Sequence, residues 1–438
     1  MDKDLAKMNE ILSTQMDGFI RAMAPYLSAS EDAEGLVDRN SAEYLRNLTF
    51  LRLASCTMED MEDPAAFLQG KFEKLFTALH PLGSPIVYGI VSRGGKASLV
   101  IGVNASVSGA IVKPVLQGLL AGMELEECAF DFSASLGREG RGGFLCAVPV
   151  LKTDEGKQKF DLSALMRSLN GEAYTILFYA KPVPAKLAQE KYTAVLRIRD
   201  VCAAVGKRNI SAQKATNQTR TVTKNATRRG LVQEALGQIV RDQKVDGRAL
   251  IDAVIDGGNL SYSISDAETL KSLTTGISYD MHNGMALEMA GLCDRAIERL
   301  KFGQGTGLWS VAISYAACGA ACDILEACIC GELARPTADL LPLRRIPYRL
   351  EDGQSVYLPN DSEDNPLLTP LTSAELGMVC TPPADIVPDF ARKRGKAYPL
   401  IPLGGGIEIG KVMDGYRPLP NMAFALSEED LNRHTFLC

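Results

Sequence analysis

Short apolar stretches that alternate with turn signals, from residue 86 to residue 350, constrain the fold of this chain more than any other feature. Residues 86–92 and 97–103 are two such stretches, and Arg93-Gly94-Gly95-Lys96 lies between them. A tight hairpin turn needs positive φ angles, which glycine adopts without strain, so this pattern predicts a β-hairpin. A helix over residues 111–122 is expected next. A strand, a strand and a helix in this order form one half of a ferredoxin-like unit.

The rest of this region continues the alternation. It predicts strands at 143–151, 174–180, 308–315 and 345–350, and helices at 162–169, 185–205, 281–302 and 321–333. We therefore expect an α+β fold in which mixed sheets with ferredoxin-like βαβ elements are packed by long helices. The two longest helices, 185–205 and 281–302, are expected to form an antiparallel pair with the intervening residues at its tip.

Four regions are expected along the chain. Residues 1–43 form an amino-terminal helix, which should stop near Pro25, and a linker. Residues 44–350 form a mixed α/β body with a basic polar insertion at 206–266. Residues 351–400 are interpreted as a Pro-rich linker or strap, in which Thr372 and Glu375 should cap a short helix. Residues 401–438 form a small β segment.

The composition is that of a globular protein. The chain has 438 residues, of which 46% are hydrophobic and 23% are charged, with a net charge of -6. The most apolar stretches are too short, or too interrupted by acidic residues, for a membrane-spanning helix, which needs about 20 apolar residues. The first residues do not resemble a signal peptide, because Asp2, Asp4 and Glu10 interrupt them. We therefore expect a cytoplasmic location and no transmembrane segment.

No set of residues predicts catalysis or metal binding. The eleven cysteines include no CxxC pair, and the cluster Cys318, Cys322, Cys328 and Cys330 is interpreted as core thiols rather than a metal site. The three histidines, at 80, 282 and 434, do not fall into a triad or ligand pattern. The glycines at 303, 305 and 307 follow a helix and precede a strand, whereas a phosphate loop precedes a helix. They are interpreted as a helix-terminating turn.

The strongest functional signal is a run of positive charge in residues 206–230. This segment contains seven basic residues and no acidic residue, and the rest of it is mostly small and polar: the basic residues are Lys207, Arg208, Lys214, Arg220, Lys224, Arg228 and Arg229. In an acidic protein such a segment is a candidate binding site for nucleic acid, for an acidic partner or for a membrane surface. A solvated loop without a ligand is the alternative. The segment contains no aromatic residue, so base stacking is not supported.

The last residues predict a capped turn and then a strand. Ser427 and Asp430 are spaced as in a capping box, and residues 435–438 form an apolar run without a turn residue to close it. Residues 432–438, together with 406–412 and 419–426, resemble the approach to the phosphate loop in HerA-type and conjugative-transfer ATPases, the FtsK–HerA superfamily. Further upstream, residues 174–182 and 303–315 are the best local matches to this family.

This resemblance implies that the chain is the amino-terminal region of a motor and ends just before the Walker A loop. Residues 435–438 would then be the first strand of a P-loop core. The full protein would hydrolyse ATP with Mg²⁺, assemble as a hexameric ring, and move DNA or another macromolecule. The 438 residues themselves would hold no cofactor and would serve in assembly, docking or substrate guidance. The alternative is a stand-alone adaptor that binds nucleic acid or an acidic protein through the basic segment.

Overall fold

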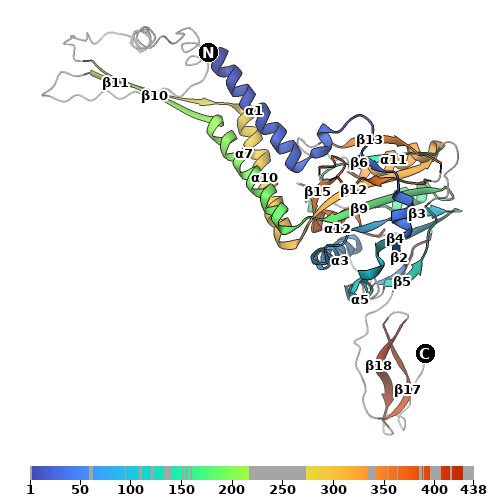
Figure 1. Cartoon of the computed structure of the whole chain (residues 1–438). Coiled ribbons are helices and arrows are strands. Elements are labelled where there is room, and N and C mark those ends of the chain that lie inside the picture. Colours follow the sequence, from blue (N-terminus) through green and yellow to red (C-terminus); the bar gives the residue numbers. More distant parts are fainter. Residues whose placement is uncertain are drawn as a thin grey trace. The chain divides into compact units, whose positions relative to one another are not determined.

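The computed structural model divides the chain into two compact units (Figure 1). The first, which we call the arm, comprises Met1–Phe19 and Thr193–Ile297, and the second, the body, comprises Ile20–Tyr192 and Glu298–Cys438. The structure describes residues 2–58, 63–93, 95–107, 111–119, 123–132, 140–149, 152–153, 156–157, 160–216, 273–333, 342–352, 354–362, 364–383, 387, 389–394, 406–414 and 417–427.

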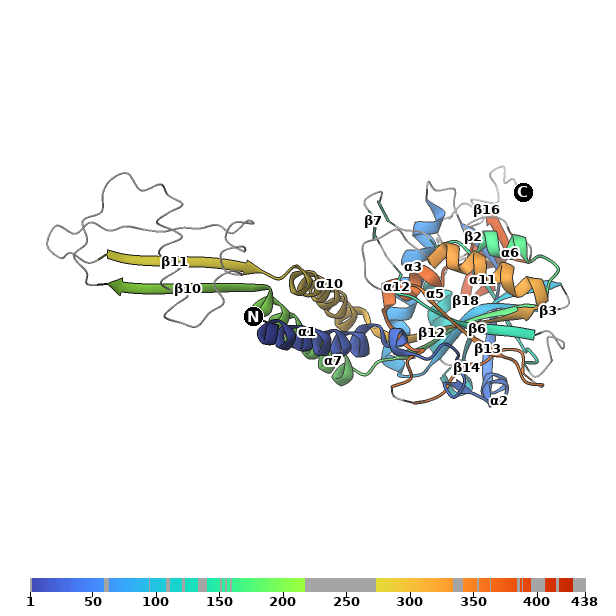
Figure 2. The same cartoon turned by 90° about the horizontal axis from the view of Figure 1, so that it is seen from above.

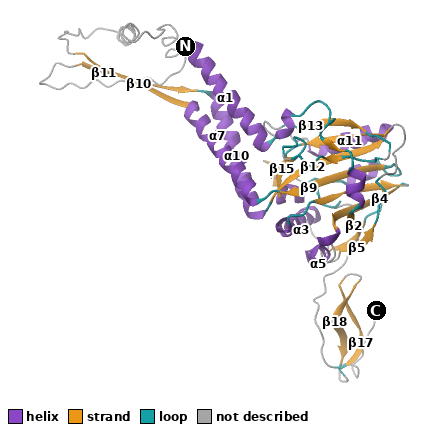
Figure 3. Ribbon diagram, in the orientation of Figure 1, coloured by secondary structure: helices purple, strands orange, loops and turns teal. Residues whose placement is uncertain are grey.

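A ten-stranded sheet lies at the centre of the described body (Figure 3). Its main path runs β13-β6-β12-β9-β3-β4-β2-β16, while β15 pairs with β12 and β5 pairs with β2. All pairs are antiparallel except that of β16 with β2. The strands are β2 (Leu48–Met58), β3 (Ile86–Arg93), β4 (Lys96–Asn104), β5 (Met123–Cys128), β6 (Gly140–Cys146), β9 (Tyr174–Pro182), β12 (Leu308–Cys318), β13 (Arg344–Arg349), β15 (Thr369–Thr372) and β16 (Ala391–Arg394).

Helices cover both faces of this sheet, and strand alternation explains why. In β3, Tyr88 and Ile90 point to one core and Val87 and Val91 to the other, because successive side chains of a strand point to opposite faces. The first core also contains residues of α3 (Pro64–Leu79), α5 (Lys113–Leu119), α6 (Ser163–Ser168), α11 (Gly319–Leu333) and α12 (Ser373–Val379). Figure 2 shows α3, α11 and α12 on one side of the sheet and α2 (Ser41–Arg46) on the other.

The predicted α+β class is confirmed at this level. The hairpin predicted around Gly94 and Gly95 is formed by β3 and β4. Their pairing runs from Ile86 opposite Val103 to Arg93 opposite Lys96, next to the turn. The other predicted strands correspond to β6, β9, β12 and β13, and α6 and α11 match predicted helices closely. The ferredoxin-like grouping remains a prediction. Residues 435–438, the predicted first strand of a P-loop core, lie outside the described residues.

Residues 351–400 are not a linker where the structure describes them, and this corrects the predicted boundary. The strand β15 joins the central sheet beside β12, and α12 follows with all seven of its residues buried. Thr372 and Glu375 form the predicted capping box of this helix. Leu371, Leu376 and Phe390 belong to the main core. Pro370, Pro382 and Pro383 are buried, which does not fit an exposed strap, whereas Pro388 and Pro399 lie outside the described residues.

The amino-terminal segment also contributes to the body. The predicted helix is present as α1 (Asp2–Met23) and ends near Pro25 as expected, and a 3-10 turn, η1 (Pro25–Ser28), begins at Pro25. Tyr26 in this turn and Ala33 after it belong to a core on the second face of the sheet. The short strand β1 (Val37–Asp38) pairs with β14 (Leu358–Pro359). Residues 20–43 are therefore packed structure, although the sequence suggested a linker.

Smaller elements complete the description. The body also includes η2 (His80–Leu82), α4 (Ala105–Val107), and a two-stranded sheet of β7 (Lys152–Thr153) and β8 (Gly156–Lys157). The strands β17 (Ile407–Asp414) and β18 (Arg417–Leu426) form a separate antiparallel hairpin, in the region predicted to be a small β segment. On this hairpin Ile407, Ile409 and Phe424 are exposed.

Candidate polyanion-binding ribbon

The arm contains an antiparallel helix pair, as the sequence predicted. The helices are α7 (Ala185–Gly206) and α10 (Gly284–Thr306), and in the arm Arg199 Nε lies 3.0 Å from Asp294 Oδ1. Seven positions later on α7, a Cβ at Gly206 would lie 2.8 Å from Leu287 Cδ2, seven positions earlier on α10. The two contacts define a constant antiparallel register. The buried residues of the pair in the arm are Val195, Ile198, Cys202, Ala286, Met289, Ala290, Leu292, Cys293, Ala296 and Ile297.

The helix α1 packs against this pair at a small residue. A Cβ at Gly18 would lie 3.3 Å from Ile198 Cδ1 of α7, and Leu12 and Phe19 of α1 are buried. Small residues allow two helices to approach closely, and burial of large apolar residues stabilises the contact. The arm therefore has an apolar core formed by three helices.

A two-stranded ribbon continues directly from α7 and leads into α10. It consists of β10 (Lys207–Thr216) and β11 (Leu273–His282), which pair along their full length. Asn283 fixes the junction, since its backbone N–H donates to Gly206 O at 3.1 Å. Its side chain Oδ1 accepts a hydrogen bond from Ala286 N at 3.2 Å and so caps the start of α10.

The ribbon contains the first three residues of the predicted basic site. Lys207 pairs with His282, Arg208 with Met281 and Lys214 with Thr275. The strand β10 has these three positive charges and no acidic residue, and β11 has a single carboxylate, Asp280. The described ribbon is therefore net positive in a protein whose total charge is -6.

The other four residues of the predicted site, Arg220, Lys224, Arg228 and Arg229, lie outside the described residues. The sequence shows these basic residues, but it did not predict that Lys207, Arg208 and Lys214 belong to a strand. The signal that favours the strand is the apolar and β-branched content of residues 273–282 opposite them.

A second, smaller basic cluster lies on the central sheet. Arg392, Lys393 and Arg394 form most of β16, which pairs in parallel with the end of β2. In the order of the described sheet, β16 is a terminal strand. Charged residues are common on edge strands, where they oppose pairing with other chains. This cluster therefore has a structural explanation that does not require a ligand.

The part of the chain that the structure describes contains no group of three or more residues suited to hold a metal ion. The predicted cysteine cluster consists of Cys322, which is buried, and Cys318, Cys328 and Cys330, which are partly buried. Burial raises the pKa of Cys330 and Cys322, so both thiols remain protonated. A protonated thiol is a poor nucleophile and a poor metal ligand.

The glycine turn does not fit a phosphate group. The helix α10 runs through Gly303 and Gly305 to Thr306, so it ends slightly later than predicted, and Gly307 is the residue with a left-handed φ of 108°. A helix carboxyl end presents carbonyl oxygens, which repel anions. Two of these oxygens, on Thr306 and Gly307, already accept hydrogen bonds from Ser373.

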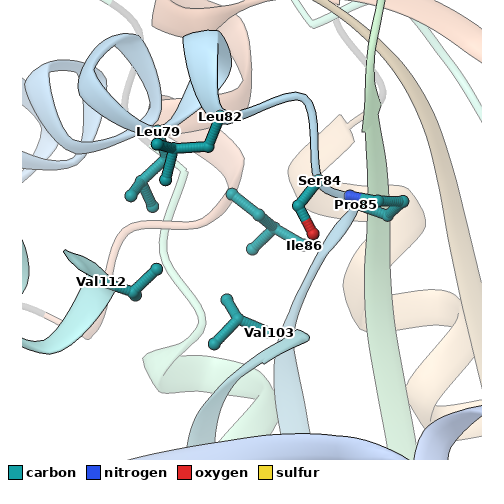
Figure 4. Close-up of a pocket in the computed structure, with 7 residues that line it drawn as sticks. All are labelled: Leu79, Leu82, Ser84, Pro85, Ile86, Val103 and Val112. Atoms are coloured by element: carbon teal, nitrogen blue, oxygen red, sulfur yellow. The ribbon is translucent and has the colours of Figure 1, made fainter. Parts of the chain in front are cut away.

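Two hollows of the described body differ in kind. One is a small apolar cavity of about 10 Å³ (Figure 4), lined by Leu79, Leu82, Ser84, Pro85, Ile86, Val103 and Val112. It has room for no more than about one water molecule. The other is an open groove of about 1210 Å³ beside β6, β13 and α11. In it Arg39 is paired with Glu351, and Arg141 with Asp323. The lining also includes Asp32, Glu34, Glu326 and Arg349, so acidic residues outnumber basic ones in the groove, and it does not favour a polyanion.

Comparisons with known proteins identify no relative. No family model matches this chain, and neither do the curated proteins or the solved structures. None of the described helices combines the length and apolar character that crossing a membrane requires.

Proposed function

We propose that this chain is the non-catalytic amino-terminal region of a ring-forming, ATP-dependent motor of the HerA or conjugative-transfer type, and that its arm guides a polyanionic substrate such as DNA. The observation that carries the substrate-guiding role is the basic ribbon. Lys207, Arg208 and Lys214 lie on a strand that begins where α7 ends, so a helical support holds them.

The physical basis of the proposed binding is neutralisation of phosphates. Lysine and arginine bind the nucleic-acid backbone without reading its sequence, which suits a protein that moves along DNA. Strands that enter a groove of DNA are a known mode of recognition, and two-stranded ribbons fit the major groove. The basic residues continue beyond Lys214 in the sequence, and this adds charge to the same segment.

The motor assignment is supported by the resemblance of residues 406–438 to HerA-type proteins. The hairpin β17–β18 falls in that region. Exposed apolar side chains on a two-stranded hairpin favour packing against a further surface, because such hairpins are marginally stable alone. ATP, Mg²⁺, the hexameric ring and a cytoplasmic location follow from the resemblance and from the composition. The alternative, an adaptor that binds nucleic acid or an acidic protein, uses the same ribbon.

DNA binding by charge variants tests the guiding role. The variant K207S/R208S/K214S should bind a duplex oligonucleotide at least about tenfold more weakly than wild type at low salt, because phosphate contacts are lost. Fluorescence anisotropy measures this affinity. A matched control, K96S/K186S/K301S, removes three exposed lysines from the body, and its affinity for the duplex should be nearly that of the wild type. Equal losses in both variants, or no loss in the first, would reject the ribbon as the binding site.

A further inference from the structure

The end of α10 takes part in a connected set of polar contacts in the described body. Arg299 Nε lies 2.6 Å from Glu375 Oε1, and its Nη2 lies 2.9 Å from Glu375 Oε2. The Glu375 side chain is only 3% exposed and that of Arg299 is 21% exposed. Two parallel hydrogen bonds between a guanidinium and a carboxylate fix both groups in orientation as well as in distance.

The same carboxylate is also part of the α12 capping box. Glu375 Oε2 accepts a hydrogen bond from Thr372 N at 2.8 Å, and Thr372 Oγ1 accepts one from Glu375 N at 3.3 Å. Arg299 Nη2 donates a further hydrogen bond to Pro370 O at 2.9 Å. We call Arg299, Thr372 and Glu375 the latch. It connects α10 to both β15 and α12.

The residues at the end of α10 and just after it are also fixed by hydrogen bonds and ring contacts. Ser373 Oγ donates to Thr306 O at 2.7 Å and accepts from Trp309 Nε1 at 3.0 Å, while Ser373 N donates to Gly307 O at 3.0 Å. The His80 ring lies edge-on against Trp309, and His80 Nε2 is 2.9 Å from Leu308 O. Trp309 is fully buried.

The glycines of this segment serve close packing. A Cβ at Gly307 would lie 2.7 Å from His80 Cγ, and one at Gly303 would lie 3.1 Å from Leu308 Cδ1. Gly307 also has a positive φ, which other residues adopt only with strain. Three glycines in five residues usually suggest a flexible hinge. Here Gly307 is required by the His80 ring and by its positive φ, and Gly303 lies in close contact with the Leu308 side chain.

We propose that residues 299–309 form a rigid joint locked by the latch, so that α10 cannot bend at its glycine-rich end and any bending of α10 occurs before Arg299. The buried ion pair supports this role. Pairs of this kind add little net stability, because burying the charges is costly, and fixing one conformation is a documented use. The joint leads directly into β12, an interior strand of the sheet. The proposal does not depend on what the arm binds.

Hydrogen exchange measured by mass spectrometry tests the joint. In the wild type, amides in a peptide covering residues 303–309 should exchange as slowly as those of the buried strand β9. The variant E375Q keeps the shape of the side chain but removes its charge, and should speed exchange in this peptide at least about tenfold. The matched control E351Q alters the exposed pair with Arg39, and it should not change the exchange rate of the 303–309 peptide or of the β9 peptide.

Three results would overturn the proposal. The first is rapid exchange at residues 303–307 in the wild type, which would show that the glycines form a hinge. The second is unchanged exchange in E375Q. The third is an equal increase in the 303–309 and β9 peptides, which would show that the latch affects only global stability. If E375Q does not fold, R299K provides the same test, because lysine retains the charge but cannot form the two parallel hydrogen bonds.

Discussion

At the residue scale, buried hydroxyl groups in this protein differ in whether they have partners. The Tyr348 hydroxyl lies 2.9 Å from Ser314 Oγ, donates to Tyr315 O at 3.0 Å and accepts from Tyr357 N at 3.2 Å. The Tyr88 ring lies against Phe72 and Phe178, and its buried hydroxyl has no hydrogen-bond partner among the described residues. Burial of a polar group without a partner lowers stability, whereas a satisfied one contributes to it.

Phenylalanine substitutions at these two tyrosines should therefore have opposite effects. Y88F removes an unsatisfied group and should leave the free energy of unfolding unchanged or raise it by about 1 kcal/mol. Y348F leaves the partners of the hydroxyl unsatisfied and should lower it by about 1–3 kcal/mol. Urea unfolding followed by circular dichroism measures both. A larger loss in Y88F than in Y348F would contradict this account of the two sites.

Buried thiols predict a loss of stability at alkaline pH. Burial raises the pKa of Cys146 and Cys293 to about 12 and that of Cys128 to about 11. In the unfolded chain a cysteine loses its proton near pH 8.5, so above that pH the folded state holds more protons than the unfolded state. The stabilisation is complete below about pH 8.5 and decreases as the pH rises towards 11 and 12.

Under reducing conditions, the urea concentration at the midpoint of unfolding should accordingly decrease as the pH is raised from 8 to 10. In C146A the fall should be smaller, because one of the groups responsible is absent. A midpoint that stays constant or rises over this range would show that these thiols are not buried as described.

At the scale of elements, the turn after α10 separates two roles of glycine. A Cβ at Gly305 would meet open space, whereas one at Gly307 would meet His80 and would also need a positive φ. G305A should stabilise the protein by about 0.5–1 kcal/mol, because alanine favours helices. G307A should destabilise it by more than that amount. Thermal unfolding of the two variants compares them directly, and equal melting temperatures would argue against a packed joint.

The elements also show what sequence could and could not predict. The strands β3, β4, β9 and β12 are recognisable because they are continuous apolar runs, as expected for strands buried on both faces. The short helix α12 was expected from its capping box, but the segment that contains it was interpreted as a linker or strap because its prolines suggest loops. The burial of this segment depends on residues far away in the sequence that belong to the same core, such as Phe76, which is about 300 positions away, and Trp309, which is 64 positions from Ser373. Local periodicity does not contain that information.

The candidate site shows the same limit. Composition alone identified Lys207, Arg208 and Lys214, because a run of basic residues without carboxylates is easily recognised in a sequence that is acidic overall. Their strand was missed because β10 is mostly polar and lacks the regular alternation of a half-buried strand. Its pairing with β11 joins residues that are 57 to 75 positions apart. The latch was also missed, since the sequence links Thr372 to Glu375 but not to Arg299.

At the scale of the whole molecule, the arm and the body contribute different parts of the proposed function. The arm holds a net-positive ribbon on a helical core, and the body contains a large covered sheet. Among the described residues of either unit, no metal-ligand group is present. We therefore place the proposed contact with the substrate on the arm and the proposed assembly role on the rest of the chain.

The salt dependence of DNA binding tests the central claim most directly. Each phosphate contact contributes about 0.9 to the slope of log affinity against log salt concentration. Replacing all seven basic residues of the segment, Lys207, Arg208, Lys214, Arg220, Lys224, Arg228 and Arg229, with serine should weaken binding and make this slope shallower by several of those increments. An affinity and a slope identical to those of the wild type would contradict the claim that this segment holds the polyanion.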